Sequence, residues 1–140
     1  MRKVIVESPY KAKTFLGRWL NVRYARKCVR HSLLLGEAPY ASHLFYTQPG
    51  ILNDGDWRER MWGIEAGLLW GKSAEATVVY VDRGVSRGME YGIEAAKAAG
   101  RTIEYRQIET GQRNSGRSNV VGLPELSVSE PSPKPHHKTR

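Results

Sequence analysis

The sequence predicts an α/β fold of the Rossmann-like, three-layer kind, with a short parallel sheet of four to five strands. Short apolar runs without alternation recur along the chain, which is typical of strands buried on both faces. Stretches of helical period separate these runs, as expected for parallel strands joined by right-handed crossovers. With 140 residues, of which 40% are hydrophobic, the chain is long enough for one domain with a proper core.

The first half of the chain predicts two strands with one helix between them. Residues 3–8 form a continuous apolar strand, and residues 9–20 are expected to be a polar loop. Asn21 is a candidate N-cap for a helix that ends at Gly36. A short second strand then covers residues 38–42.

The second half begins with a loop and predicts two more helices and two more strands. Turn-forming pairs make residues 43–56 a long loop, after which Asp54 or Asp56 caps a helix. Trp57, Trp62 and Trp70 lie on more than one face of that helix, which indicates helix packing or a subunit interface. The remaining expected elements are a strand over 76–81, a helix over 87–99 with Ser86 as N-cap, and a strand over 102–106.

Residues 109–140 are rich in Gly, Ser, Asn, Pro and charge, and we expect them to be a disordered extension of the domain at residues 1–108. The chain has one cysteine, Cys28, no signal-peptide pattern and no apolar run that spans a bilayer. These features predict a cytoplasmic protein without disulfides and without membrane contact. Because no His, Cys or Asp residues have the spacing of zinc ligands, we expect neither a metal nor a cofactor.

The formal charge of +8 is concentrated at the N-terminus. Residues 1–31 hold nine Lys or Arg against one acid, whereas residues 32–108 hold eight basic and ten acidic side chains. A basic block of this kind is a solvated face, a nucleic-acid patch or the rim of a pocket for a phosphorylated molecule. Composition alone leaves these three interpretations open.

The ends of the first three strands are expected to line one crevice, because ligands bind beyond the carboxyl ends of parallel strands. Hydroxyls, an amide, an imidazole and carboxylates there suit a ligand with several hydrogen-bonding edges, such as a nucleoside. The turn after the third strand also presents helix N–H groups to an anion. The candidate binding residues are Ser8, Tyr10, Lys11, His43, Tyr46, Gln48, Ser86, Arg87 and Gly88.

Four segments together resemble the nucleoside 2-deoxyribosyltransferase-like superfamily, which includes deoxynucleoside monophosphate N-glycosidases and small phage and bacterial proteins of unassigned function. They are residues 7–10 (Glu-Ser-Pro-Tyr), the helix begun at Asn21, residues 38–44 (Ala-Pro-Tyr-Ala-Ser-His-Leu) and residues 86–89 (Ser-Arg-Gly-Met). The resemblance covers residues 3–106. It implies a Rossmann-like sheet, a nucleotide or nucleoside ligand, and a homo-oligomer in which a neighbour helps to close the site.

The resemblance also implies a catalytic glutamate four residues after Gly88, where this chain has Gly92. Ser86 and Gly88 match the family's phosphate or ribose contacts. Glycosidic cleavage is commonly performed by paired carboxylates, and Glu7 and Asp82 stand at the ends of two strands. We therefore take Glu7 and Asp82 as the candidate catalytic residues, with hydrogen bonding to a ligand as the alternative role.

Three functions follow from the sequence. The first is an enzyme that cleaves or transfers at the N-glycosidic bond of a nucleotide or nucleoside. The second is a nucleotide sensor or sequestering protein of the same fold, which the missing helix glutamate favours. The third is a nucleic-acid-binding protein that uses the basic N-terminal block.

Overall fold

The computed structural model describes residues 1–108, and it has the α/β architecture that the sequence predicts. The four strands are β1 (Arg2–Glu7), β2 (Glu37–Tyr40), β3 (Ala76–Tyr80) and β4 (Thr102–Arg106). All neighbouring strands are parallel, in the order β2-β1-β3-β4. The expected disordered extension at 109–140 lies outside the described residues.

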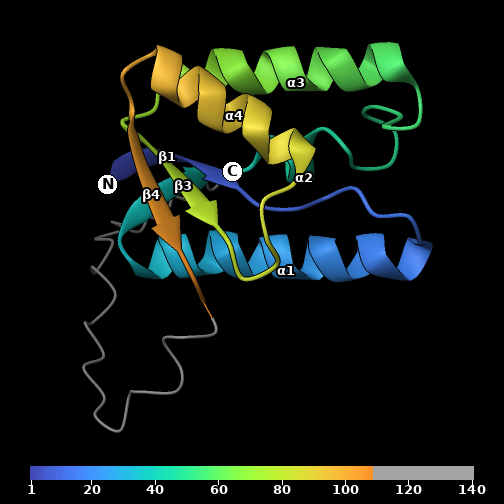
Figure 1. Cartoon of the computed structure of the whole chain (residues 1–140), viewed down its shortest axis with the longest axis horizontal. Coiled ribbons are helices and arrows are strands. Elements are labelled where there is room, and N and C mark those ends of the chain that lie inside the picture. Colours follow the sequence, from blue (N-terminus) through green and yellow to red (C-terminus); the bar gives the residue numbers. More distant parts are fainter. Residues whose placement is uncertain (109–140) are drawn as a thin grey trace, which may run out of the picture.

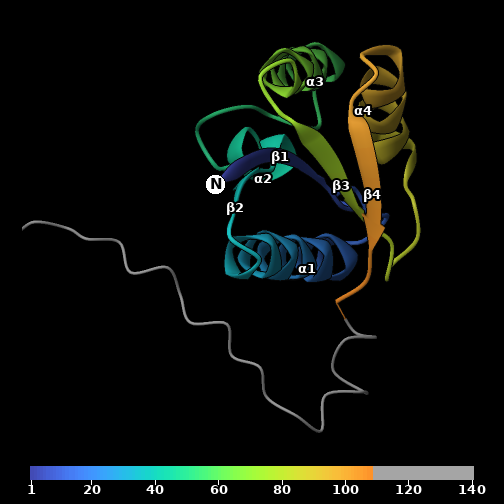
Figure 2. The same ribbon diagram turned by 90° about the vertical axis from the view of Figure 1, so that its left-hand side faces the viewer.

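Helices cover both faces of the sheet and make three layers. Figures 1 and 2 show α1 (Phe15–Leu34) alone on one face, with α3 (Trp57–Gly71) and α4 (Arg87–Ala98) on the other. The one-turn helix α2 (Ser42–Phe45) lies on the side of α3. Because the chain leaves β1 toward β2 and later returns to β3 on the other side of β1, the strand order reverses at β1, where ligands of doubly wound sheets bind.

The core is divided by the alternation of the strand side chains. Val4, Val6, Val78 and Tyr80 point toward α1, where they pack with Tyr24 and Cys28. Val79 points the other way and packs with Met89 and Ile93 of α4. Glu7 pairs in register with Val79, so its side chain lies on the α4 side of the sheet.

Helix α1 is longer than the sequence predicts. It starts at Phe15, capped by Thr14, whose side chain accepts a hydrogen bond from the Gly17 amide. Phe15 is exposed, as are the other apolar residues of the first turns, so this segment has no apolar period. Asn21 is not the cap: it is buried within the helix, and its Nδ2 donates to the carbonyl oxygen of Tyr10 at 3.1 Å.

The other elements start and end close to the predicted residues, with two differences. The loop expected at 43–56 contains most of α2, which begins at Ser42, and the second strand starts one residue earlier, at Glu37. Asp56 caps α3 and Ser86 caps α4 through side-chain oxygens. Within residues 1–108 no helix is both long and apolar enough to cross a bilayer.

The three tryptophans of α3 do not belong to the core. Trp57 is 70% exposed, Trp62 61% and Trp70 58%. They lie on more than one side of α3, and Trp70 contacts Tyr40 with ring centroids 5.7 Å apart. Their exposure leaves little of the expected helix packing within residues 1–108, and the subunit interface stays a prediction.

A buried ionic network joins the outer strands across the α1 face of the sheet. The Glu37 carboxylate accepts from Arg2 at 2.5 Å, from Arg106 at 2.7 and 2.8 Å, and from Ser32 at 2.6 Å. Arg2 and Arg106 also bind Glu104. The Arg106 hydrogen bond is the main cause that lowers the pKa of Glu37 to about 2.

We expect Glu37→Gln to lower the free energy of unfolding by about 3 kcal/mol at pH 7, because the largely buried Arg106 guanidinium loses one of its two carboxylate partners. The folded-state pKa of Glu37 lies below the ordinary value of 4.5, so its contribution is fully present above pH 4.5 and is lost as the pH falls toward about 2. Urea unfolding at pH 7, 4 and 3 measures the difference between the two proteins. Glu94→Gln, which breaks an exposed pair with Lys97, is the control and should cost less than about 0.5 kcal/mol. A pH-independent difference would contradict the role given to the Glu37 charge.

Candidate functional site

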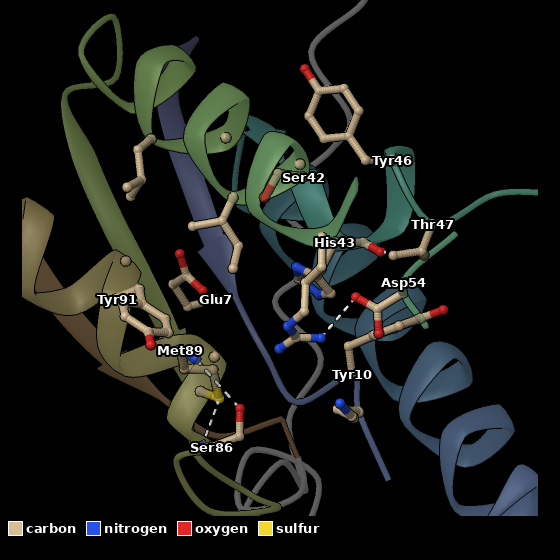
Figure 3. A pocket seen from close by; sticks show the side chains of 18 of the residues that line it. Glu7, Tyr10, Ser42, His43, Tyr46, Thr47, Asp54, Ser86, Met89 and Tyr91 are labelled. Atoms are coloured by element: carbon tan, nitrogen blue, oxygen red, sulfur yellow. Dashed lines mark hydrogen bonds and ion pairs between the residues drawn. The ribbon is translucent and has the colours of Figure 1, made fainter. Parts of the chain in front are cut away.

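A cavity of about 520 Å³ lies at the carboxyl end of β1, walled by α2, α3 and the start of α4. Figure 3 shows Glu7, Ser86 and Tyr91 on one side of it in this view, with Tyr10, His43 and Asp54 opposite. The loops after β1, β2 and β3 therefore deliver side chains to one place, as expected at the point where the strand order reverses. The predicted residues that line the cavity are Glu7, Ser8, Tyr10, Lys11, His43, Tyr46, Ser86, Arg87 and Gly88.

Two predicted residues do not line the cavity. The Asp82 carboxylate accepts hydrogen bonds from the Tyr24 hydroxyl of α1 and from the Ile108 amide at 2.9 Å. The Asp82 side chain therefore lies on the α1 side of the sheet. Every second residue points to the same side, so residue 82 follows Val78 and Tyr80 toward α1, whereas Val79 points the other way. Gln48 is exposed, two residues after the cap of α2, and also lies outside the cavity lining.

Glu7 and Gly92 touch across the cavity wall. A Cβ built on Gly92 would lie 1.9 Å from the Glu7 Oε1 atom and 2.5 Å from its Cδ atom. The head of Glu7, which comes from β1, therefore occupies the space in which any side chain at position 92 of α4 would begin. Glycine at 92 is required for this approach, because a larger residue would displace the carboxyl group.

The environment of Glu7 favours its protonated form in the empty cavity. Burial raises the pKa of Glu7 to about 8, and the positive charge of Arg101 opposes this rise. Arg101 is fixed beneath α3, where its Nε donates to Thr77 Oγ1 at 2.9 Å and its Nη1 donates to the Gly71 carbonyl at 2.6 Å. A strongly shifted carboxyl in a cavity is typical of functional sites.

His43 and Ser8 form a second polar pair on the cavity wall. The Ser8 Oγ and His43 Nε2 atoms are 2.8 Å apart, and the Tyr10 ring lies next to the imidazole with centroids 6.5 Å apart. Burial lowers the pKa of His43 to about 4, so the imidazole is neutral at pH 7 and offers a fixed hydrogen-bonding edge. Within residues 1–108, no three His, Cys, Asp or Glu side chains are grouped so as to hold a metal ion.

The start of α4 and three cations make the part of the cavity beside Gly88, about one helical turn before Gly92, suitable for an anion. Arg60 of α3 is paired with Asp54 at 2.8 Å, and its Nη2 atom lies 3.8 Å from the position that a Cβ of Gly88 would take. Nothing comes closer to that position, so a ligand can approach the Gly88 backbone. Lys11 and Arg87 also line the cavity, and the first N–H groups of α4 lie beside Gly88.

Sequence reasoning missed the contribution of α3 and the Arg101 side chain. Gly63, Gly67 and Gly71 recur every four residues along α3 and all line the cavity. A Cβ on Gly67 would lie 2.6 Å from the Ser42 hydroxyl, so the missing side chains let α2 pack directly on α3. This spacing of four was visible in the sequence and indicates one glycine-lined helix face.

The comparisons with known proteins agree with this fold. A family model described as a domain of unknown function, DUF7768, matches residues 2–106. The chain belongs to this family. No curated protein matches the sequence.

Several solved structures are similar to the chain. One of them is described as a 2-deoxyribosyltransferase from the psychrotolerant bacterium Bacillus psychrosaccharolyticus, and it aligns with a TM-score of 0.53 and 17% identity. The alignment covers 75% of this chain and 72% of that one. At this identity the similarity establishes the α/β fold of this member of the DUF7768 family and a distant structural relationship to that protein.

We expect Gly92→Ala to displace the Glu7 carboxyl group and to lower its pKa from about 8 toward the ordinary value of 4.5, because the displaced group moves toward solvent. The loss of stability should be only about 1 kcal/mol, since the end of a flexible side chain moves. Carbon-13 NMR titration of the glutamate side chains measures the shift. Gly88→Ala, whose Cβ meets nothing within 3.8 Å, is the matched control and should leave the pKa of Glu7 unchanged. An unchanged pKa in Gly92→Ala would refute the contact.

Proposed function

We propose that the protein binds a nucleotide or nucleoside in this cavity and cleaves or transfers at its N-glycosidic bond, with Glu7 as the carboxylate at the anomeric carbon. The observation that carries the proposal is the contact between Glu7 and Gly92. In the superfamily that the sequence resembles, the attacking glutamate is expected at the position of Gly92. Here a carboxyl group from β1 fills the adjoining space, so a carboxyl group is present although its point of attachment differs.

The role of Glu7 is to bond to, or stabilise, the anomeric carbon as the bond to the base breaks. The electron pair of that bond leaves with the base, which takes up a proton, and water or a second base then completes hydrolysis or transfer. Only the ionised carboxylate can do this. The positive charge of Arg101 favours ionisation of Glu7, as does positive charge that develops on the sugar.

The part of the cavity beside Gly88, about one helical turn before Gly92, fits the phosphate of a nucleotide. Backbone N–H groups at the start of α4, the open approach to Gly88 and the Arg60 guanidinium supply donors and positive charge there. Tyr10, His43 and Tyr46 then offer aromatic faces and a neutral imidazole edge to the base. A nucleotide sensor without turnover is the second candidate, and the pKa of Glu7, which burial raises to about 8, favours it.

We expect the purified protein to be stabilised against heat by one or more nucleoside monophosphates and to release free base from them. Glu7→Gln should reduce base release at least a hundredfold while thermal stabilisation by the nucleotide remains, because the carboxylate acts on the bond and not on the phosphate. Chromatographic detection of free base across a panel of ribo- and deoxyribonucleotides measures both substrate and rate. Glu90→Gln, an exposed acid of α4 outside the cavity lining, is the control and should keep full activity. Stabilisation without base release would support the sensor.

We expect Gly92→Glu alone to be inactive, because the new side chain starts 1.9 Å from Glu7 Oε1. Combining it with Glu7→Ala removes that overlap and returns one carboxylate to the cavity from α4. The double variant should recover at least tenfold more base release than Glu7→Ala alone, with the same assay as the measurement. If the double variant and Glu7→Ala release base at equal rates, a carboxylate on α4 does not substitute for the one on β1. That result would contradict the proposal that Glu7 takes the place of the expected helix glutamate.

A further inference from the structure

The outer face of α1 carries a line of positive side chains that neither the fold nor the cavity uses. From Ser8 to Gly36 the chain has no acidic residue. At 100° per residue, Trp19, Arg23, Arg26 and Arg30 fall within an arc of about 60°, directly opposite the buried face that contains Tyr24 and Cys28. We call these four residues the α1 stripe.

All four side chains of the α1 stripe are turned to solvent. The three arginines are exposed, and Trp19 is 46% exposed. No ion pair joins these arginines to another residue within 1–108, and Arg23 lies over the Trp19 ring at 4.7 Å from its centroid. The stripe spans about 16 Å along the helix, with neighbouring side chains about 5 to 6 Å apart.

The position of α1 excludes one interpretation of the basic N-terminus. Figures 1 and 2 show α1 on the face of the sheet opposite α3 and α4, which wall the cavity. The arginines of the stripe are therefore not the rim of the cavity, although Lys11 from the same basic block is. Their charge is directed toward a separate, anionic partner.

The composition of the stripe favours a nucleic acid over other anionic partners. Two copies of the stripe would repel each other, so it does not fit a second copy of this chain. A membrane surface is also disfavoured, because exposed apolar residues such as Phe15 and Leu34 lie at opposite ends of α1 and the arginines interrupt any continuous apolar face. An exposed tryptophan beside arginines matches the stacking platform and phosphate contacts of single-strand binders.

We propose that the α1 stripe binds single-stranded nucleic acid, with the arginines on successive phosphates and Trp19 stacked on a base. This surface acts independently of the cavity and does not rest on the function proposed for Glu7. The salt dependence of affinity reports the phosphate contacts, and loss of Trp19 reports the stacking.

The test is fluorescence anisotropy of the full chain with labelled 20-mers of dT and rU and a 20-bp duplex, at 50 to 200 mM salt. We expect Arg23→Glu/Arg26→Glu/Arg30→Glu to weaken binding of the single strands at least tenfold and to reduce the slope of log affinity against log salt by about 2. Trp19→Ala should weaken binding about tenfold with the slope unchanged. The two single strands distinguish DNA from RNA.

The control carries the same change of charge elsewhere. Lys3→Glu/Arg58→Glu/Lys72→Glu reverses three exposed cations on β1, at the start of α3 and at its C-cap, and should bind within threefold of the wild type. An excess of nucleoside monophosphate should leave the binding of the single strands unchanged, which separates this surface from the cavity. The proposal is overturned if the control triple is as weak as the stripe triple, if Trp19→Ala has no effect, or if polyglutamate or phosphatidylserine vesicles bind the stripe more tightly than the single strands. Circular dichroism confirms that each variant is folded.

Discussion

The alternation of side chains along β1 is the constraint on which the rest of the molecule depends. Val4 and Val6 point into the core beneath α1, so Glu7, one residue later, must point to the side of α3 and α4. A shift of one residue would carry the carboxyl group away from the cavity and turn the valines toward α3 and α4. The same packing that makes β1 the centre of the sheet thus fixes a titratable group at the floor of the cavity.

The position of the Glu7 carboxyl group also requires a glycine at position 92, which has no side chain. A carboxyl group on a strand and a glycine on a helix complement each other in volume, and neither is informative alone. In the superfamily that the sequence resembles, an acid is expected at position 92, whereas here the carboxyl group beside that position comes from β1. The structure shows this neighbour, which the spacing of the motif alone does not reveal.

The elements with a clear hydrophobic period could be predicted from the sequence, and those stabilised by tertiary contacts could not. The start of β3 and the start of α4 agree with the prediction, because a continuous apolar run and a serine cap specify them. The sequence does not predict the first turns of α1, because their apolar residues are exposed. It predicts Asn21 as a helix cap, whereas the side-chain amide of Asn21 donates a hydrogen bond to the loop after β1. The sequence predicts Asp82 in the crevice because it shows that this residue follows a strand. It does not show which face of the sheet the side chain points to.

The charges of the cavity also constrain where the parts of a ligand lie. Lys11, Arg60, Arg87 and Arg101 face the carboxyl groups of Glu7, Asp54 and Glu59. A phosphate beside Glu7 would oppose its ionisation and raise a pKa that burial already raises, whereas a phosphate at Gly88 lies next to Arg60 and the amides of α4. In the complex proposed above, the phosphate would therefore lie at Gly88, about one helical turn from the carboxyl group beside Gly92, with the sugar next to Glu7. The base would then face the neutral His43, which, unlike a charged imidazole, accepts as well as donates a hydrogen bond.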